Sequence, residues 1–179
     1  LPLGGSGESG RNCMAVIFGD DMVIVDCGLS FPNEEMPGID IVIPDFTFIK
    51  ENKHKLRALI LTHAHEDHIG AVSYLMRDVK CPIYGAELTI SMLRMKLEDK
   101  MDTRSVDLQI VEFGEKVKAG KLELELIRIT HSIPESGAVA VHTELGAVLF
   151  TGDFKFDFTP VDGKLSNLSR LAEIGEQGV

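Results

Sequence analysis

The chain has 179 residues, 44% of them hydrophobic, and its 18 basic and 28 acidic side chains give a formal net charge of −10. This length and composition are typical of one ordinary globular domain with a buried core. The acidic balance argues against binding of nucleic acid through a basic face, although bound metal ions could supply positive charge. No apolar run approaches the roughly 20 residues of a membrane helix, and residues 1–12 lack the apolar stretch of a signal peptide.

The three cysteines, Cys13, Cys27 and Cys81, are odd in number and far apart. This pattern argues against a disulfide framework and predicts reduced thiols in a cytoplasmic protein.

Taken in chain order, the expected elements are mostly short strands with a few helices between them. Strands outnumber helices and several form hairpins, which predicts an α+β fold with antiparallel pairing rather than a regular βαβ array. Apolar residues at helical spacing predict that helix 87–100 packs through Leu88, Met92 and Met95, with Met101 as a further candidate just after it. Strand 121–130 alternates strictly, so one of its faces should be charged and face outward. The expected strands are 13–19, 22–28, 39–44 (or an extended piece), 57–62, 80–85, 121–130, 138–143 and 147–152, and the expected helices are 69–79, 87–100 and 166–178.

The stretch HAHEDH, residues 63–68, follows directly on the predicted strand 57–62. Side chains two residues apart in an extended chain point the same way, so His63 and His65 can bind one ion. Asp67 and His68 then lie at the turn into the next helix and form a second ligand pair. Imidazole and carboxylate ligands suit Zn²⁺, and also Mn²⁺ or Fe²⁺. We expect Glu66 to face away into solvent.

Two better-known motifs are near misses. The helical zinc motif HExxH would need His at position 69, where the chain has Ile69. The glycine block Gly5–Gly10 fits GxGxxG, but Arg11 and Asn12 stand where a P-loop has Lys and Ser or Thr. We expect no strand before the block and a strand after it, so both nucleotide-binding interpretations fail. The block is therefore predicted to be a loop near the edge of the active site.

Further metal ligands are expected at the ends of later strands. His131 follows strand 121–130 and would complete a three-histidine site with His63 and His65. Asp153 follows strand 147–152 and has two oxygens that could bridge both ions. The two remaining histidines, in KENKHK and within strand 138–143, are predicted to be structural.

HAHEDH resembles the HxHxDH signature of the metallo-β-lactamase superfamily, and VIVDCG, THS and TGD follow its further motifs in the same order. LGGSGESGRN, VDCGLSFP, GIDIVIPD and TGDFKFD are similar to the ribonuclease J branch, RNA-degrading enzymes of the β-CASP group. The resemblance covers nearly the whole chain. It implies an αββα sandwich, of which residues 1–179 would be the N-terminal part, ending before an expected β-CASP insertion.

The resemblance also implies roles for individual residues. His63, His65 and His131 would hold one divalent ion, Asp67 and His68 a second, and Asp153 would bridge them; Asp67, His68 and Asp153 would also act in catalysis. Asp26 would be a buried residue that orients the ligands. Two ions, most simply Zn²⁺ with Mn²⁺ as the alternative, would activate a bridging hydroxide for attack on phosphorus. The substrate would be single-stranded RNA, cut internally, from the 5′ end, or both, and the full-length protein would be a homo-oligomer.

Two other functions stay open at this point. One is a metallo-β-lactamase-fold hydrolase of small esters, thioesters or lactams. The other is a metal-binding fragment without catalytic activity, because the general acid and most of the RNA groove would lie outside residues 1–179.

Overall fold

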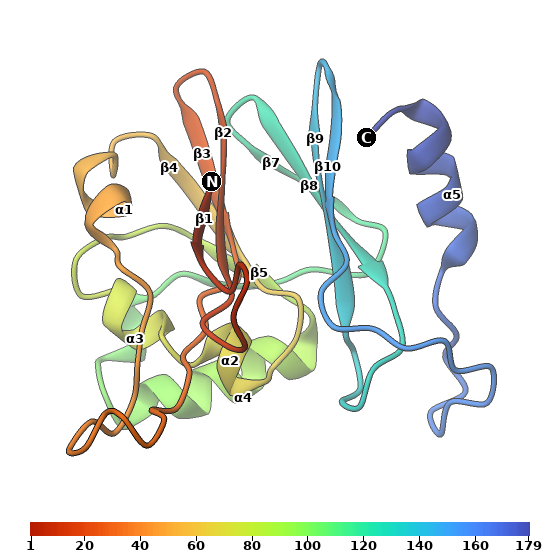
Figure 1. Ribbon diagram of the computed structural model, residues 1–179. Helices are drawn as coiled ribbons and strands as arrows, with labels where there is room; N and C mark the ends of the chain where they lie inside the picture. The colour runs from red at the N-terminus through yellow and green to blue at the C-terminus, as the bar shows by residue number, and fades with distance from the viewer.

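The computed structural model describes residues 1–179 and shows two β-sheets packed face to face with helices on both outer sides (Figure 1). The six-stranded sheet has the order β1 (Pro2–Gly4), β2 (Cys13–Phe18), β3 (Asp21–Val25), β4 (Leu56–Ile60), β5 (Ile83–Gly85) and β6 (Leu108–Ile110). The four-stranded sheet has the order β10 (Gly146–Phe150), β9 (Gly137–Thr143), β8 (Leu122–Arg128) and β7 (Lys116–Ala119). The helices are α1 (Thr47–Glu51), α2 (Glu66–Ile69), α3 (Val72–Leu75), α4 (Glu87–Glu98), the 3₁₀ turn η1 (Thr103–Ser105) and α5 (Leu168–Gln177).

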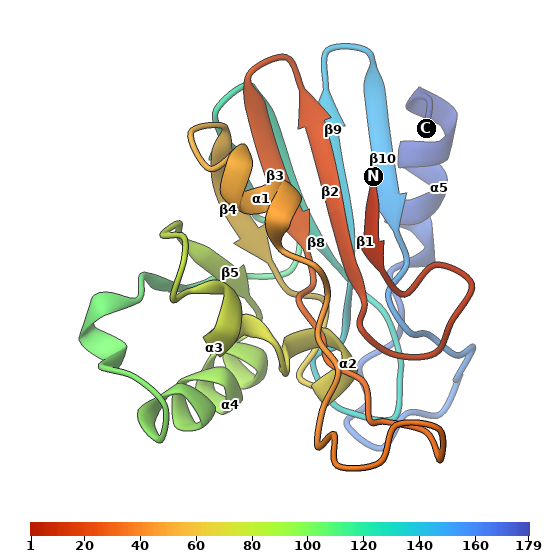
Figure 2. The same ribbon diagram turned by 60° about the vertical axis from the view of Figure 1, so that its left-hand side comes forward.

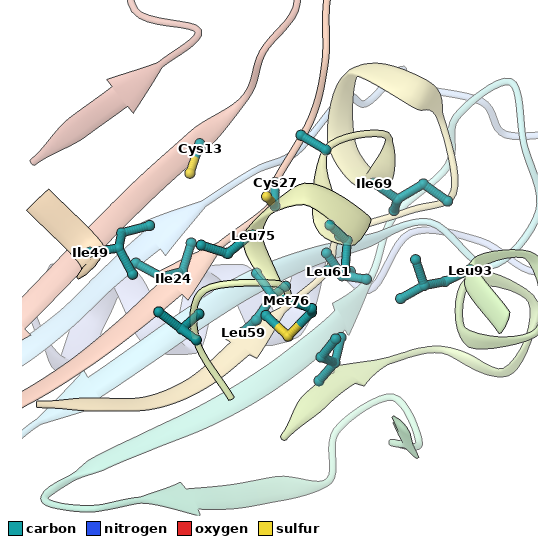
Figure 3. Packing of buried hydrophobic residues seen from close by; sticks show 14 of the residues in the cluster. Cys13, Ile24, Cys27, Ile49, Leu59, Leu61, Ile69, Leu75, Met76 and Leu93 are labelled. Atoms are coloured by element: carbon teal, nitrogen blue, oxygen red, sulfur yellow. The ribbon is translucent and has the colours of Figure 1, made fainter. Parts of the chain in front are cut away.

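Three hydrophobic clusters fill the three spaces between the four layers. In β4, Leu59 points to the helices α1–α4 while Ile60 points to the second sheet, because successive strand residues face opposite sides. Figure 3 shows the first cluster, in which Leu59 packs with Ile49 of α1 and Leu93 of α4. The third cluster joins the second sheet to Ile174 of α5. This layering confirms the predicted αββα sandwich.

Strand pairing is mixed in the first sheet and antiparallel in the second. The predicted hairpin is confirmed, since β2 and β3 pair antiparallel from Met14 opposite Val25 to Phe18 opposite Asp21. However, β3, β4, β5 and β6 pair in parallel, so the expectation of antiparallel pairing holds only for part of this sheet. Figure 2 shows α1 and α3 beside these parallel strands.

Several expected elements differ from the structure in ways that local sequence explains. The helix expected over 69–79 is present only as α3, Val72–Leu75, and a turn at Gly70–Ala71 separates it from α2, which ends at Ile69. Residues 39–44 form no strand and make only one bridge, between Ser30 and Val42. β1 does precede the glycine block, contrary to expectation, and β6 and β7 were not predicted. Their short runs, PLG, LQI and KVKA, carry no strong strand pattern.

The stripe predicted for α4 is wrong for Met92 and Met95, whereas Leu88 is half-buried and Met101, just beyond the helix, packs against the first cluster. Met92 and Met95 are 39% and 69% exposed, whereas the helix buries Thr89, Ile90, Leu93 and Leu97. Both sets repeat at helical spacing, so periodicity alone does not select the face. The β-branched and leucine side chains fill the space over the first sheet instead.

The outer face of β8 is charged, as predicted, but α5 covers it. Glu125 is 2% exposed, and its two carboxylate oxygens accept hydrogen bonds from Nε and Nη2 of Arg170 in α5 at 2.7 and 2.9 Å. His142 Nε2 of β9 lies 2.8 Å from the same carboxylate. Burial opposes ionisation, but Arg170 and His142 outweigh it and lower the pKa of Glu125. This buried ion pair fastens α5 to the sheet.

All three cysteines are free, as expected. Burial raises the pKa of the Cys27 thiol well above its usual range, which argues against a reactive thiolate. None of the helices has the length and apolar character needed to span a bilayer.

Candidate metal centre

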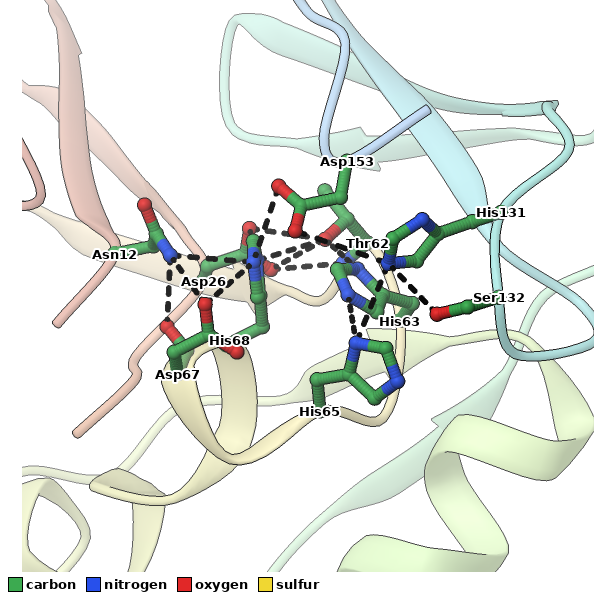
Figure 4. Close-up of polar contacts among 10 residues, drawn as sticks. All are labelled: Asn12, Asp26, Thr62, His63, His65, Asp67, His68, His131, Ser132 and Asp153. Carbon is green, nitrogen blue, oxygen red and sulfur yellow. Dashed lines mark hydrogen bonds and ion pairs between the residues drawn. The ribbon is translucent and has the colours of Figure 1, made fainter. Parts of the chain in front are cut away.

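The candidate metal-binding side chains come from three segments that meet at one edge of the sandwich (Figure 4). The first segment runs from the end of β4 into α2 and carries the HAHEDH stretch. His131 lies just beyond β8 and Asp153 just beyond β10, so both come from the second sheet. The site is therefore built where the two sheets face each other.

The turn between β4 and α2 is held against the end of β3 by main-chain hydrogen bonds. Cys27 N donates to His68 O at 2.8 Å, and Leu29 N donates to Glu66 O at 3.0 Å. Gly28 makes this approach possible, since a Cβ there would lie 1.6 Å from the main-chain oxygen of Asp67. A residue with a side chain would push α2, and the ligands it carries, away from the sheet.

Three imidazoles converge on one point, as the sequence predicted for this trio. His63, His65 and His131 place one nitrogen each within 4.8 Å of one another. His63 Nε2 lies 3.0 Å and His131 Nε2 3.3 Å from the same atom, His65 Nδ1. A single proton on His65 Nδ1 could serve both neighbours only as a shared, bifurcated hydrogen bond, whereas a cation would accept a lone pair from each of the three rings.

A second group forms beside the first. His63, His68 and Asp153 also place one ligand atom each within 4.8 Å of one another. Asp153 lies between the histidines, with Oδ1 3.5 Å from His68 Nε2 and Oδ2 3.7 Å from His131 Nε2. Asp67 Oδ2 is 3.5 Å from His68 Nε2 but belongs to neither group. The structure thus brings all six predicted ligands together, with Asp67 at the periphery.

Asp26 and Thr62 fix how the two buried histidines are protonated. Asp26 is 5% exposed, and its carboxylate accepts from Thr62 N at 2.8 Å and from Thr62 Oγ1 at 3.0 and 3.1 Å. His68 Nδ1 lies 2.8 Å from Asp26 Oδ2, so Nδ1 carries the proton and donates it. Thr62 donates its only hydroxyl proton to Asp26. His63 Nδ1 lies 3.0 Å from Thr62 Oγ1 and must therefore be the donor of that hydrogen bond. The Nε2 atoms of both histidines are left as lone-pair donors that face the centre.

Asn12 also reaches the site and was not predicted to do so. Its Nδ2 lies 3.0 Å from Asp67 O, 3.3 Å from Asp67 Oδ2 and 3.1 Å from His68 Nε2. The only signal was its place at the end of the glycine block, which was predicted to lie near the active-site edge.

The electrostatic environment keeps the innermost ring neutral. Burial, and then the neighbouring imidazoles of His68, His65 and His131, lower the pKa of His63 to about 2. Burial also lowers the pKa of His131. Burial opposes a charge on His68 as well, but the hydrogen bond to Asp26 and the nearby carboxylates outweigh it and raise its pKa. A neutral imidazole is the form that binds a metal, so His63 is already in that form, whereas an ion at His68 must compete with the proton that the carboxylates favour.

The residues predicted to be structural lie away from the centre. His54 is exposed in the loop before β4, and His142 pairs with Glu125 under α5. Glu66 faces away from the centre and is exposed, as expected, and its carboxylate also pairs with Lys96 of α4.

Two hollows flank the cluster. One, of about 280 Å³, is lined by Asn12, Asp26, His68 and Asp153 together with the end of β10. The other, of about 260 Å³, lies beside His131. Its lining carries three cations and three anions, so its net charge is close to zero although the whole chain is acidic. These charged residues are Arg128, Glu135, Lys155, Asp157, Asp162 and Lys164.

The fold is that of a known superfamily. The model of the Metallo-beta-lactamase superfamily matches residues 6–172, and the chain belongs to this superfamily. Ribonuclease J of Synechocystis sp. is 44% identical over 181 residues, which cover 100% of this chain and 28% of that protein. Ribonuclease J of Thermus thermophilus is 42% identical over 186 residues, covering 100% of this chain and 32% of that protein. The resemblance to ribonuclease J is confirmed, and the chain spans about a third or less of the length of these curated relatives.

A solved structure supports the fold independently. The metallo-beta-lactamase fold protein YhfI from Bacillus subtilis superposes with a TM-score of 0.60 at 18% identity. The superposition covers 88% of this chain and 60% of that one. At this identity the similarity concerns the fold alone.

Proposed function

We propose that this chain is the metal-binding part of a metal-dependent ribonuclease that hydrolyses phosphodiester bonds of single-stranded RNA, internally, from the 5′ end, or both. The observation that supports this most is the two adjacent ligand groups, His63–His65–His131 and His63–His68–Asp153, each with its atoms within 4.8 Å. Because His63 Nε2 has one lone pair, it can serve only the first ion, and His68 and Asp153 remain for the second. Two adjacent divalent ions are a common device for phosphodiester hydrolysis. The similarity of this whole chain to 28% of ribonuclease J of Synechocystis sp. supports RNA as the substrate class.

The donor set fits two divalent ions. His63, His65 and His131 would hold one ion, Asp67 and His68 the second, and Asp153 would bridge the two. Zn²⁺ suits three imidazoles best, and Mn²⁺ is the alternative where carboxylates dominate. When bound, such ions lower the pKa of a water molecule and offset negative charge on phosphate oxygens.

The protein itself orients the candidate ligands and fixes their protonation. Asp26 accepts the His68 Nδ1 proton, and Thr62 accepts the His63 Nδ1 proton, so both Nε2 lone pairs stay directed at the centre. Asp153, 48% exposed, faces solvent on its open side, where a substrate can approach. In the proposed reaction Asp67, His68 and Asp153 act closest to the attacked phosphorus.

The net charge of −10 would disfavour binding of a phosphate backbone, but the hollow beside His131 is less acidic than the chain as a whole. Arg128, Lys155 and Lys164 line it, although Lys155 also pairs with Asp157 at 2.8 Å. A phosphodiester whose reacting group lies at the histidines would place the adjoining nucleotide there. That residues 1–179 precede a β-CASP insertion, that the full-length protein is a homo-oligomer, and that it is cytoplasmic, all stay predictions.

The test combines metal content with cleavage. Metals are counted by mass spectrometry, and a 5′-labelled single-stranded RNA and a small nitrophenyl ester are offered as substrates. His65→Ala and Asp67→Ala are compared with His54→Ala, a matched control because His54 is exposed and outside the site. We expect about two ions per chain, fewer in the two site variants, and RNA cleavage that only those two variants lose.

Each other outcome overturns a definite part of the proposal. Ester hydrolysis without RNA cleavage would mean a small-molecule hydrolase of the same fold. Two bound ions with neither activity would mean a metal-binding module without catalysis. No metal at saturating Zn²⁺ and Mn²⁺ would overturn the site itself.

A further inference from the structure

We propose that Asn12 is a positioning residue for the second metal ion and that the glycine block serves to hold it over Asp67. This inference rests on the proposed function, because it assigns Asp67 and His68 to that ion. It gives a purpose to the block Gly5–Gly10, which fits neither nucleotide-binding motif.

The backbone of Asn12 is fixed on both sides. Its N–H donates to Asp67 O at 3.0 Å, and its carbonyl accepts from Gly28 N at 2.9 Å. Asn12 therefore joins the end of β3 to the first turn of α2. The loop before it closes tightly, since a Cβ on Gly5, whose φ is +82°, would lie 2.7 Å from Asn12 Oδ1.

The orientation of the side-chain amide follows from its partners. Asp67 O and Asp67 Oδ2, at 3.0 and 3.3 Å from the amide nitrogen, can only accept hydrogen bonds. The NH₂ group must therefore face Asp67. His68 Nε2, 3.1 Å away, is also an acceptor, because His68 Nδ1 donates to Asp26.

This amide is the group that orients Asp67 toward the centre. The Asp67 side chain is 39% exposed, and the Asn12 amide is the side-chain group that donates a hydrogen bond to its carboxylate. Without the amide, the carboxylate is free to turn into solvent and away from His68 Nε2. With the His68 lone pair given to an ion, donation from Asn12 to Asp67 remains. Residues that hydrogen-bond to metal ligands in this way typically contribute about 10- to 100-fold to metal affinity.

The test separates this role from a merely structural one. Binding of Co²⁺ and Zn²⁺ is measured by chelator competition and by the Co²⁺ absorption spectrum, for the wild type, Asn12→Ala and Asn12→Leu. The Leu variant keeps the branched shape without the donor, which covers the case in which the smaller Ala variant does not fold. Asn52→Ala is the matched control, since it removes a side-chain amide that donates to Phe48 O at 2.9 Å in α1, outside the site.

We expect the second ion to bind about 10- to 100-fold more weakly in both Asn12 variants, with a changed Co²⁺ spectrum and an unchanged first ion. Asn52→Ala should leave both affinities unchanged. Equal weakening of both ions, or no weakening, would overturn the role of Asn12 while leaving the metal centre in place. A wild type that binds fewer than two ions would instead overturn the proposed function on which the inference rests.

Discussion

Replacing Asp26 by Asn tests the protonation scheme of the site most directly. In the wild type, the Asp26 carboxylate accepts from Thr62 N, from Thr62 Oγ1 and from His68 Nδ1. An amide can still accept both Thr62 protons through its oxygen, but its NH₂ then faces His68 Nδ1. His68 must move its proton to Nε2, so that Nδ1 becomes the acceptor.

The size of the effect can be worked from this exchange. A hydrogen bond to a buried charged group contributes about 1.5–3 kcal/mol, and one between neutral groups about 0.5–1.5 kcal/mol. Asp26→Asn should therefore lower the free energy of unfolding by about 1–2 kcal/mol. For a chain of this size, that corresponds to a fall in Tm of about 2–8 °C.

The assay uses the protein stripped of metal with a chelator. The histidine ring nitrogens are observed by ¹⁵N NMR, and Tm is measured by calorimetry. Asp21→Asn is the matched control: Asp21 is 6% exposed, accepts from Lys121 N at 2.8 Å and pairs with Arg57, far from His68. It should lower Tm without changing the protonation of His68. A His68 ring that still carries its proton on Nδ1 in Asp26→Asn would refute the reasoning.

Two further predictions concern packing around the site. Gly28→Ala should destabilise the protein by at least about 3 kcal/mol, because the new Cβ would overlap the main-chain oxygen of Asp67. Gly175→Ala in α5 should instead stabilise it by about 0.5–1 kcal/mol, because a Cβ there meets nothing within 4 Å. Urea unfolding of both variants checks this, and equal changes in the free energy of unfolding would contradict it. Arg170→Ala should cost about 3–5 kcal/mol by leaving the Glu125 carboxylate buried without its main partner. The lowered pKa of Glu125 means that its contribution is present above the unfolded value near 4.3 and is lost as the pH falls through the folded pKa. Arg170→Ala should therefore unfold at a higher pH in an acid titration followed by circular dichroism, and an unshifted midpoint would count against the pairing.

The features that could be predicted from the sequence are those that depend on neighbours along the chain. His63 and His65 share a side because they are two residues apart in an extended turn, and the structure places His63 Nε2 3.0 Å from His65 Nδ1. The strands with strong apolar patterns, such as β4 and β8, were also predicted within a few residues.

The features that were missed depend on which distant segment lies opposite. Asn12 contacts Asp67 across 55 positions of the chain, and no local pattern marks that contact. In α4, two apolar stripes compete, and only packing against the first sheet selects Leu93 over Met95. The charged face of β8 was expected in solvent, but Arg170 of α5 neutralises and covers it.

The division of the proposed ligands between the two sheets ties the candidate metal centre to the stability of the sandwich. His63 and His68 follow β4 of the first sheet, whereas His131 and Asp153 follow β8 and β10 of the second. Their separation is set by the cluster between the sheets, in which Ile60 packs with residues of β8 and β9. Ions that bind only the folded arrangement stabilise it by mass action, by about 2.7 kcal/mol at a concentration 100 times the Kd. The same ions would therefore hold the two sheets together at the edge where a substrate is expected to approach.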